Sequence, residues 1–201
     1  MKTKLLKYRV FLAGVFLVAQ TATAALVDRG GGMIYDTDAN LTWLKDWNHA
    51  RASGWDEDGL MTWDKAVVWA DQLELGGYKD WRLPSALDTD GSLASLGRAS
   101  EFGHLWYLEL ENISLSINTG PFESMSSSGA TYWTGTSLHP LIAISFGAYT
   151  LSGFTDSAKS SEYRAVAVRV GDVIPVPEPQ THLLMLVGLG AAGMLASRRW
   201  R

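Results

Sequence analysis

The sequence predicts an α+β fold with an N-terminal hairpin, two or three helices and a C-terminal antiparallel sheet. Three observations lead to this fold class. Two short β-prone runs flank a turn near the start, an apolar pattern at helical spacing follows Thr62, and the last third of the domain is rich in strand-forming residues. No internal repeat is present, so these elements belong to one domain.

The hairpin is expected over residues 33–44. Residues 33–35 and 41–44 are the two strand-forming runs, and the aspartates and asparagine between them favour a turn. The segment that follows, residues 50–59, is expected to be a polar loop.

The clearest helix is expected from Thr62 to Leu75. Thr62 is a good N-cap, the apolar residues after it share one helical face, and two glycines after Leu75 end the helix. Residues 78–85 are expected to be extended up to Pro84, and residues 100–112 to form a further short helix.

Three strands are expected near the C-terminal end of the domain, after a glycine- and serine-rich loop at residues 114–130. They cover residues 131–137, 141–149 and 163–170. In the last strand valines alternate with Ala167 and Arg169, so we expect one buried face and one exposed face.

Residues 1–24 are predicted to be a signal peptide. Basic residues precede an apolar run at residues 10–19, and Ala22-Thr23-Ala24 offers a cleavage site for signal peptidase. The alternative is an uncleaved membrane anchor, which the short apolar run and the cleavage site disfavour. The exported domain then covers residues 25–175.

Residues 176–201 contain a second membrane-directed segment. Residues 183–196 are all apolar or glycine, which is shorter than the roughly 20 residues of a stable transmembrane helix. Basic residues, including Arg198 and Arg199, follow this short helix and place the tail on the cytoplasmic side.

The tripeptide Pro177-Glu178-Pro179 precedes that short transmembrane helix. The order of tripeptide, helix and arginine cluster resembles the PEP-CTERM protein-sorting signal of Gram-negative bacteria. The resemblance implies an exosortase as processing enzyme, a temporary anchor in the inner membrane, and delivery to the cell surface or the extracellular matrix. The alternative is an ordinary tail anchor behind a proline-containing linker.

The exported domain is strongly acidic. Between Leu26 and Pro175 stand 10 basic and 20 acidic residues, which gives a net charge near −10. Nucleic acids and other polyanions are therefore poor partners, since binding them depends on a basic surface. The chain has no cysteine, which excludes disulfides, thiolate metal sites and a cysteine nucleophile.

The order of motifs in the domain resembles the Lcl C-terminal domain family, a domain of unknown function. The motifs are D-T-D-A-N-L-T-W-L, T-W-D-K-A, G-G-Y-K-D-W-R-L-P-S, Y-W-T-G-T-S and A-V-A-V-R-V. The resemblance covers nearly all of the domain and implies a fold distantly similar to C-type-lectin-like domains. The closing strand has valine where members often carry cysteine, and Leu87 replaces a frequent glutamate. The oxidase chemistry of enzymatic relatives, which depends on cysteine, is therefore not implied.

Two motifs of this resemblance are expected to be structural. The residues are Trp81, Arg82, Leu83, Pro84, Tyr132 and Trp133. We expect Arg82 to form a buried bidentate pair with Asp80 or Glu101. The alternative is that Arg82 clamps an anion or a carboxylate of a ligand.

Eight tryptophans lie in the domain, and tryptophan rings pack in cores as well as on sugar rings. The sequence favours burial of Trp63, Trp81 and Trp133. Trp47 and Trp55 stand in a polar segment, so they are the predicted ligand-binding residues.

The sequence requires no cofactor, and the one candidate metal is calcium. Asp36, Asp38 and Asn40 have the spacing of the start of a calcium loop. Leu41 and Trp47 stand where such a loop needs glycine and glutamate, so turn formation alone explains the three residues.

No catalytic constellation is evident. The sequence holds no nucleophile elbow and no zinc-protease motif, and it singles out no carboxylate pair. We therefore expect a non-enzymatic, lectin-like binding or interaction domain, associated with neutral sugars or exopolysaccharide. An exported hydrolase acting on polysaccharide and a ligand-free structural component of the matrix are the alternatives.

Overall fold

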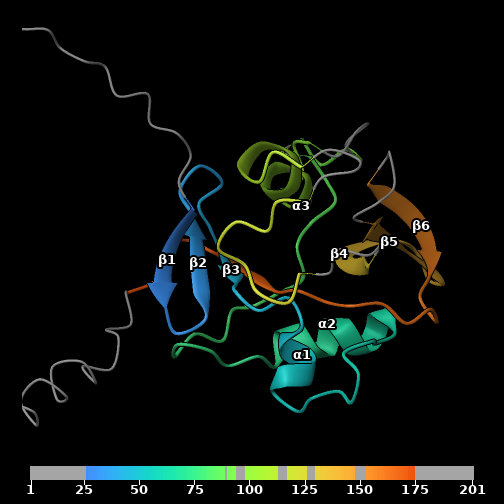
Figure 1. Ribbon diagram of the computed structural model, residues 1–201. Coiled ribbons are helices and arrows are strands. Elements are labelled where there is room, and N and C mark those ends of the chain that lie inside the picture. Colours follow the sequence, from blue (N-terminus) through green and yellow to red (C-terminus); the bar gives the residue numbers. More distant parts are fainter. Residues whose placement is uncertain are drawn as a thin grey trace, which may run out of the picture.

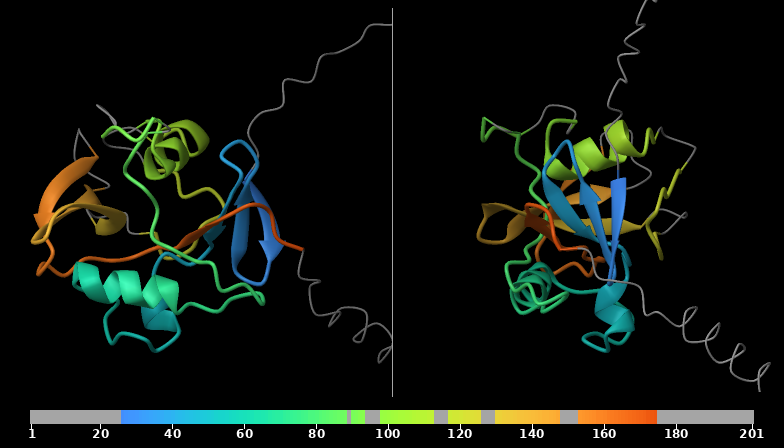
Figure 2. Two further views of the ribbon diagram at one scale, coloured as in Figure 1. Left: turned by 180° about the vertical axis from the view of Figure 1, so that it is seen from behind. Right: turned by 90° about the vertical axis from the view of Figure 1, so that its left-hand side faces the viewer.

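The computed structural model describes residues 26–174, with gaps at residues 89, 94–97, 113–116, 126–129 and 148–152. The predicted signal peptide, the predicted sorting signal and parts of the expected loop at 114–130 lie outside the described residues. The described chain forms two antiparallel sheets (Figure 1). Helix α3 lies on one side of the region between the sheets, and α1 and α2 lie on the other side, as all three views show (Figures 1 and 2).

The first sheet contains the hairpin expected at residues 33–44. Its order is β1, β2, β3, β7, and all neighbouring strands are antiparallel. The strands are β1 Leu26–Gly30, β2 Met33–Asp36, β3 Leu41–Leu44 and β7 Val168–Val170. Trp43 pairs with Ile34 on one side and with Val168 on the other. The last strand of the domain therefore completes a sheet that the first three begin.

The second sheet has the order β4, β5, β6. These strands cover Thr131–His139, Ile142–Gly147 and Phe154–Ala158. The first two match expected strands. The third was not predicted, because Asp156, Ser157 and Ala158 are weak strand formers. Its place in the sheet suits a polar strand, since the buried hydroxyls of Ser145 and Ser157 lie 2.8 Å apart and share a hydrogen bond.

The helices are short. They are α1 His49–Ala52, α2 Trp63–Asp71, α3 Glu101–Gly103 and a π-helix, η1, His104–Glu109. Helix α2 begins after the N-cap Thr62, as predicted, but ends before Leu75. Leu75 instead exchanges backbone hydrogen bonds of 3.2 and 3.0 Å with Tyr78.

The predicted α+β class was wrong, because the described residues are mostly β. Sheets of four and three strands make the fold, and the longest helix, α2, has 9 residues. Residues 100–112 were expected to form one helix but contain only α3 and the π-helix. Their helix-like apolar spacing reflects the burial of Phe102, Leu105 and Trp106 in the core. The spacing of apolar residues in this segment correctly indicated which side chains are buried, but the helix that it predicted was too long.

A segment between β6 and β7 runs from the second sheet back to the first (orange to red in Figure 2). Arg164 exchanges two backbone hydrogen bonds with β4, at 3.0 and 2.8 Å, and Ala167 accepts one from Leu44 of β3 at 3.0 Å. Residues 165–168 are all buried. The alternation predicted for residues 163–170 was therefore wrong, because a segment between two sheets is covered on both faces.

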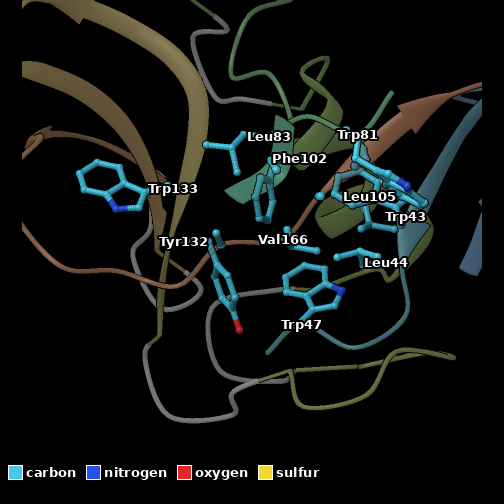
Figure 3. Packing of buried hydrophobic residues seen from close by; sticks show 14 of the residues in the cluster. Trp43, Leu44, Trp47, Trp81, Leu83, Phe102, Leu105, Tyr132, Trp133 and Val166 are labelled. Carbon is cyan, nitrogen blue, oxygen red and sulfur yellow. The ribbon is translucent and has the colours of Figure 1, made fainter. Parts of the chain in front are cut away.

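The core between the sheets is aromatic, and Trp47 lies within it (Figure 3). The Trp47 side chain is 0 % exposed. Five other rings surround it at centroid distances of 5.0 Å (Tyr132), 5.6 Å (Phe102), 5.6 Å (Phe122), 6.4 Å (Trp43) and 6.5 Å (Trp106). Most of these contacts are edge-on, the arrangement that aromatic quadrupoles prefer.

The W-R-L-P block, residues 81–84, contacts both sheets through its backbone. Arg82 exchanges hydrogen bonds of 2.9 and 2.8 Å with Val168 of β7. Pro84 accepts one of 2.9 Å from the amide of Gly135 on β4. The block therefore links the two sheets directly, with its tryptophan and leucine buried between them.

The Arg82 side chain forms the expected bidentate pair, and its partner is Glu101. Arg82 Nη1 and Nη2 donate to the two Glu101 carboxylate oxygens at 2.7 and 2.5 Å. Glu101 also accepts the backbone N–H of Ser85 at 2.7 Å, so one carboxylate fixes the turn that follows the block. The pair is less buried than expected, since the Arg82 side chain is 42 % exposed.

Asp80 pairs with Arg169 of β7 instead, at 2.8 and 3.0 Å, and this contact predicts an acid-dependent contribution to stability. The hydrogen bond from Arg169 lowers the pKa of Asp80 below its ordinary value. A lowered carboxyl pKa in the folded state adds stability above the unfolded pKa, and this stability is lost as pH falls through the folded pKa. We expect Asp80→Asn to cost less than about 1 kcal/mol at neutral pH, because Asp80 is 58 % exposed.

Urea unfolding at several pH values between about pH 2 and pH 6 measures this contribution. The difference in unfolding free energy between the native protein and Asp80→Asn should shrink as the pH falls. A difference that stays constant over this range would contradict the assignment of the pKa shift to the Arg169 pair.

Candidate ligand-binding groove

The structure separates the two tryptophans that the sequence grouped as ligand-binding residues. Trp55 is 46 % exposed, whereas Trp47 is fully buried. The predicted exposure of Trp47 was therefore wrong. Its backbone N–H donates to the carbonyl of Glu123 at 3.0 Å, and this pairing to a distant segment turns the side chain into the core.

The other tryptophans follow the sequence prediction more closely. Trp81 and Trp133 are buried, as expected. Trp63 is half-buried: its indole N–H donates to the carbonyl of Thr134 at 2.8 Å, and the Lys159 ammonium lies 3.8 Å from its ring centroid. These contacts hold Trp63 in place, and Trp55 is the tryptophan most open to solvent among the described residues.

Trp55 is positioned by the end of α1. The backbone amides of Trp55 and Asp56 both donate to the carbonyl of Ala50, at 3.0 and 3.1 Å. Gly54, which precedes them, has φ +75°, a left-handed conformation that turns the chain back after the helix. The short helix thus presents an aromatic ring to solvent on a fixed backbone.

The acidic loop after Trp55 is fixed by its own side chains. Asp56 Oδ1 accepts the backbone N–H groups of Asp58 and Gly59 at 3.2 and 2.9 Å. Asp58 accepts the amide of Leu60 at 2.9 Å, and this hydrogen bond lowers the pKa of the Asp58 carboxyl. Gly59 has φ +81°, and a Cβ there would lie 2.1 Å from Asn48 Oδ1, so the turn requires glycine.

Trp55 lines a groove between this loop and α2. The groove has a volume of about 450 Å³, and its lining residues are Trp55, Asp56, Asp64, Lys65 and Val68. Three of them stand on the outward face of α2, opposite the buried face formed by Ala66, Trp69 and Ala70. The sequence prediction missed these three residues, although the polar side of the helical pattern identifies them as exposed.

A second hollow adjoins the first, because Asp64 lines both. It has a volume of about 580 Å³ and extends from the start of α2 to the β4–β5 turn, where Leu141 is exposed. A third hollow of about 230 Å³ lies beside α2 and includes Trp63 and Arg82. Helix α2 is therefore bordered by hollows along its length.

The groove at Trp55 suits a ligand that has both apolar faces and hydroxyl groups. The ring of Trp55 and the side chain of Val68 supply apolar surface, and Asp56, Asp64 and Lys65 supply hydrogen-bonding groups. The Trp55 side chain is exposed, so its indole N–H can donate to a ligand.

The turn proposed as the start of a calcium loop is explained by hydrogen bonds. Asp36 Oδ1 accepts the backbone N–H groups of Asp38 and Ala39 at 3.1 and 2.9 Å. Asn40 Oδ1 accepts the Tyr35 hydroxyl at 2.9 Å, and Asn40 has φ +51°. These contacts are those of a polar turn, as the sequence suggested.

Two antiparallel sheets, joined by the W-R-L-P block and by a buried closing segment, define a small, mostly β domain without cysteine. The chain belongs to the Lcl C-terminal domain family, whose model matches residues 32–169. The match confirms the resemblance seen in the motifs. None of the curated proteins is similar enough to the chain to count as a match.

The PEP-CTERM protein-sorting motif matches residues 175–199 and confirms the second resemblance. The motif implies export, processing by an exosortase, and a location at the cell surface or outside the cell. Its functional residues, from Pro177 to Arg199, lie outside the described residues. Among the residues that the structure describes, no helix is both long enough and apolar enough to cross a membrane.

Proposed function

We propose that the domain is a non-enzymatic binding module that holds a neutral polysaccharide against α2. The observation that carries this proposal is the exposed Trp55 ring on the wall of a groove of about 450 Å³. Aromatic faces offer a large apolar contact to the flat C–H face of a sugar ring, at a low cost in side-chain entropy.

The shape and charge of the surface support the same ligand class. The groove and the hollow beside it share Asp64, so together they suit an extended chain better than a compact small molecule. The exported domain carries 20 acidic against 10 basic residues, which disfavours a polyanionic glycan. The sorting motif implies a surface or extracellular location, which is where a domain that binds exopolysaccharide would meet its ligand.

Affinity electrophoresis in gels that contain a soluble neutral glucan (dextran, amylose or mixed-linkage β-glucan) tests the proposal. We expect at least one of these glucans to retard the native protein. Trp55→Ala should weaken this binding by at least about tenfold, which corresponds to about 1.4 kcal/mol. Leu93→Ala removes another exposed apolar side chain away from the groove and should bind as the native protein does.

Two results would contradict the proposal. One is equal retardation of the native protein and Trp55→Ala. The other is no retardation by any neutral glucan while a sulfated glycan such as heparin retards the protein strongly. Self-association without any glycan binding would favour a structural component of the matrix instead.

A polysaccharide hydrolase is the second candidate, because Asp56 and Asp64 line the same groove and hydrolysis of glycosides uses two carboxyl groups. One of the two, Asp56, already holds the loop through Oδ1, which favours a structural role for it. Release of reducing ends from the bound glucan by the native protein, and its loss in Asp64→Asn, would establish the hydrolase. Binding without such release supports the binding module.

A further inference from the structure

Three potential metal ligands meet on the side of the domain away from the groove at Trp55. Asp36 is the last residue of β2, and His104 and Glu109 are the first and last residues of the π-helix η1. The hydrogen bond from the amide of Leu110 to the carbonyl of Leu105, at 3.0 Å, has the i→i+5 spacing of a π-helix. This wider turn is what brings His104 and Glu109 together, and π-helical turns are frequent at functional sites.

The ligating atoms of the three side chains converge. His104 Nε2 lies 3.1 Å from Glu109 Oε1 and 3.7 Å from Asp36 Oδ2. All three ligating atoms lie within 4.8 Å of one another. In the described part of the chain, Asp36 Oδ2 and His104 Nε2 are nevertheless buried without a hydrogen-bond partner.

Burying the Asp36 and Glu109 carboxylates side by side costs folding free energy unless a cation balances their charge. The side chains of Asp36 and Glu109 are 0 % and 2 % exposed. Two buried carboxylates face one imidazole, so negative charge is left over even if the imidazole is protonated.

A protonated His104 does not account for the geometry. A single N–H on Nε2 donates to one carboxylate at a time, and Asp36 Oδ2, at 3.7 Å, lies beyond hydrogen-bond distance, so Asp36 would stay without a partner for this oxygen among the described residues. An ion placed between the three atoms would satisfy the lone pair of neutral Nε2 and both carboxylates at once. The Oδ1 atom of Asp36 accepts hydrogen bonds from two backbone amides, and such outer hydrogen bonds orient the ligating oxygen toward a metal ion.

We propose that Asp36, His104 and Glu109 bind a divalent transition metal ion of the zinc class. Zinc accepts both imidazole nitrogen and carboxylate oxygen as ligands, whereas calcium and magnesium prefer oxygen ligands alone. Tetrahedral zinc, with bonds of about 2.0–2.1 Å, separates neighbouring ligand atoms by about 3.3 Å. The two separations from His104 Nε2, 3.1 and 3.7 Å, lie close to this value.

The site differs in its partners from the calcium turn considered in the sequence. It uses Asp36 but not Asn40, whose side chain accepts the hydroxyl of Tyr35. With three protein ligands, one coordination position is left for water or another small ligand. The ion would also tie β2 to the π-helix and so connect the first sheet to the helical segment above the core.

Isothermal titration of the untagged, EDTA-treated protein with zinc chloride tests the proposal, together with its melting temperature with and without zinc. We expect one tight site and a zinc-dependent rise in melting temperature, since a ligand that binds only the folded state stabilises it. His104→Ala should weaken this site by more than the roughly 10- to 100-fold lost when an outer partner of a metal ligand is removed. His139→Ala, which removes an exposed histidine far from the cluster, is the matched control and should keep the site.

Asp36→Asn and Glu109→Gln keep the volume of each side chain, and Asp36→Asn also keeps the Oδ1 acceptor of the turn. Each should remove the zinc-dependent rise while the metal-free protein stays folded. The proposal is overturned if zinc leaves the melting temperature of the native protein unchanged. It is also overturned if His104→Ala, Asp36→Asn and Glu109→Gln all bind zinc as the native protein does. The groove at Trp55 shares no residue with this site, so glucan binding is unaffected by either outcome.

Discussion

Replacing Trp47 by alanine should lower the free energy of unfolding by about 3–5 kcal/mol, the range for removing a large buried aromatic side chain. Trp47 is fully buried, and five aromatic rings would lose their shared neighbour. Domains of this size have a total stability of about 5–15 kcal/mol, so the variant should be close to unfolding. Urea unfolding followed by near-ultraviolet circular dichroism, which reports on packed aromatic rings, measures the change.

Trp55→Ala is the matched control, because it removes the same side chain from the surface. We expect it to change stability by less than about 0.5 kcal/mol. The two variants together also test the ligand-binding role that the sequence analysis predicted for both tryptophans. Similar stabilities of Trp47→Ala and Trp55→Ala would contradict the burial of Trp47.

Arg82→Ala should destabilise the domain by about 1–3 kcal/mol. Breaking a fully buried ion pair costs about 3–5 kcal/mol. We expect a smaller loss of stability for Arg82→Ala, because the Arg82 side chain is 42 % exposed and water screens the pair. The loss would come from the bidentate pair and from Glu101, which among the described residues would keep only the amide of Ser85 as its partner. A double-mutant cycle with Glu101→Gln isolates the pair, and thermal and urea unfolding give the four stabilities.

Lys79→Ala provides the control for this cycle. The Lys79–Glu74 pair is exposed on both sides, so its removal should cost less than about 0.5 kcal/mol. Arg82 also lines the small hollow beside α2, which keeps the ligand-clamp alternative open to test. An Arg82→Ala protein that unfolds like the native protein but no longer binds glucan would favour that alternative.

Local signals in the sequence identified individual elements better than the fold class. Turn residues between two β-prone runs located the hairpin, and an N-cap threonine located the start of α2. These features depend on neighbours in the chain. The balance between helix and sheet depends on which strands find partners, and β1 and β6 are held mainly by pairing with β2 and β5.

Burial was predicted less well, because it depends on contacts between distant segments. The surroundings of Trp47 in the sequence are polar, and only its pairing with the carbonyl of Glu123 directs it inward. The closing segment shows the same effect. Its alternating valines suggested a half-exposed strand, but it passes between two sheets, and residues 165–168 are all buried.

The candidate sites divide in the same way. Trp55 was identifiable because exposure of a tryptophan in a glycine- and aspartate-rich loop is a local property. His104 and Glu109 were not singled out, since their spacing matches no metal motif on an α-helix and becomes favourable only in a π-helix. The sequence did identify Asp36 as a candidate metal ligand, but it grouped Asp36 with Asp38 and Asn40 of the same turn. Its closest potential co-ligand, His104, is near in space but distant in the sequence.

The position of β7 in the first sheet also fixes the order in which the domain can fold. β7 pairs with β3, so the edge of β3 stays open until nearly the whole domain has been synthesised. Pairings between such distant segments slow folding and leave strand edges available to other chains in the meantime. The sorting motif begins at residue 175, and β7 ends before it, at Val170. Cleavage at this motif therefore leaves β7 with the domain, so that release does not reopen the edge of β3.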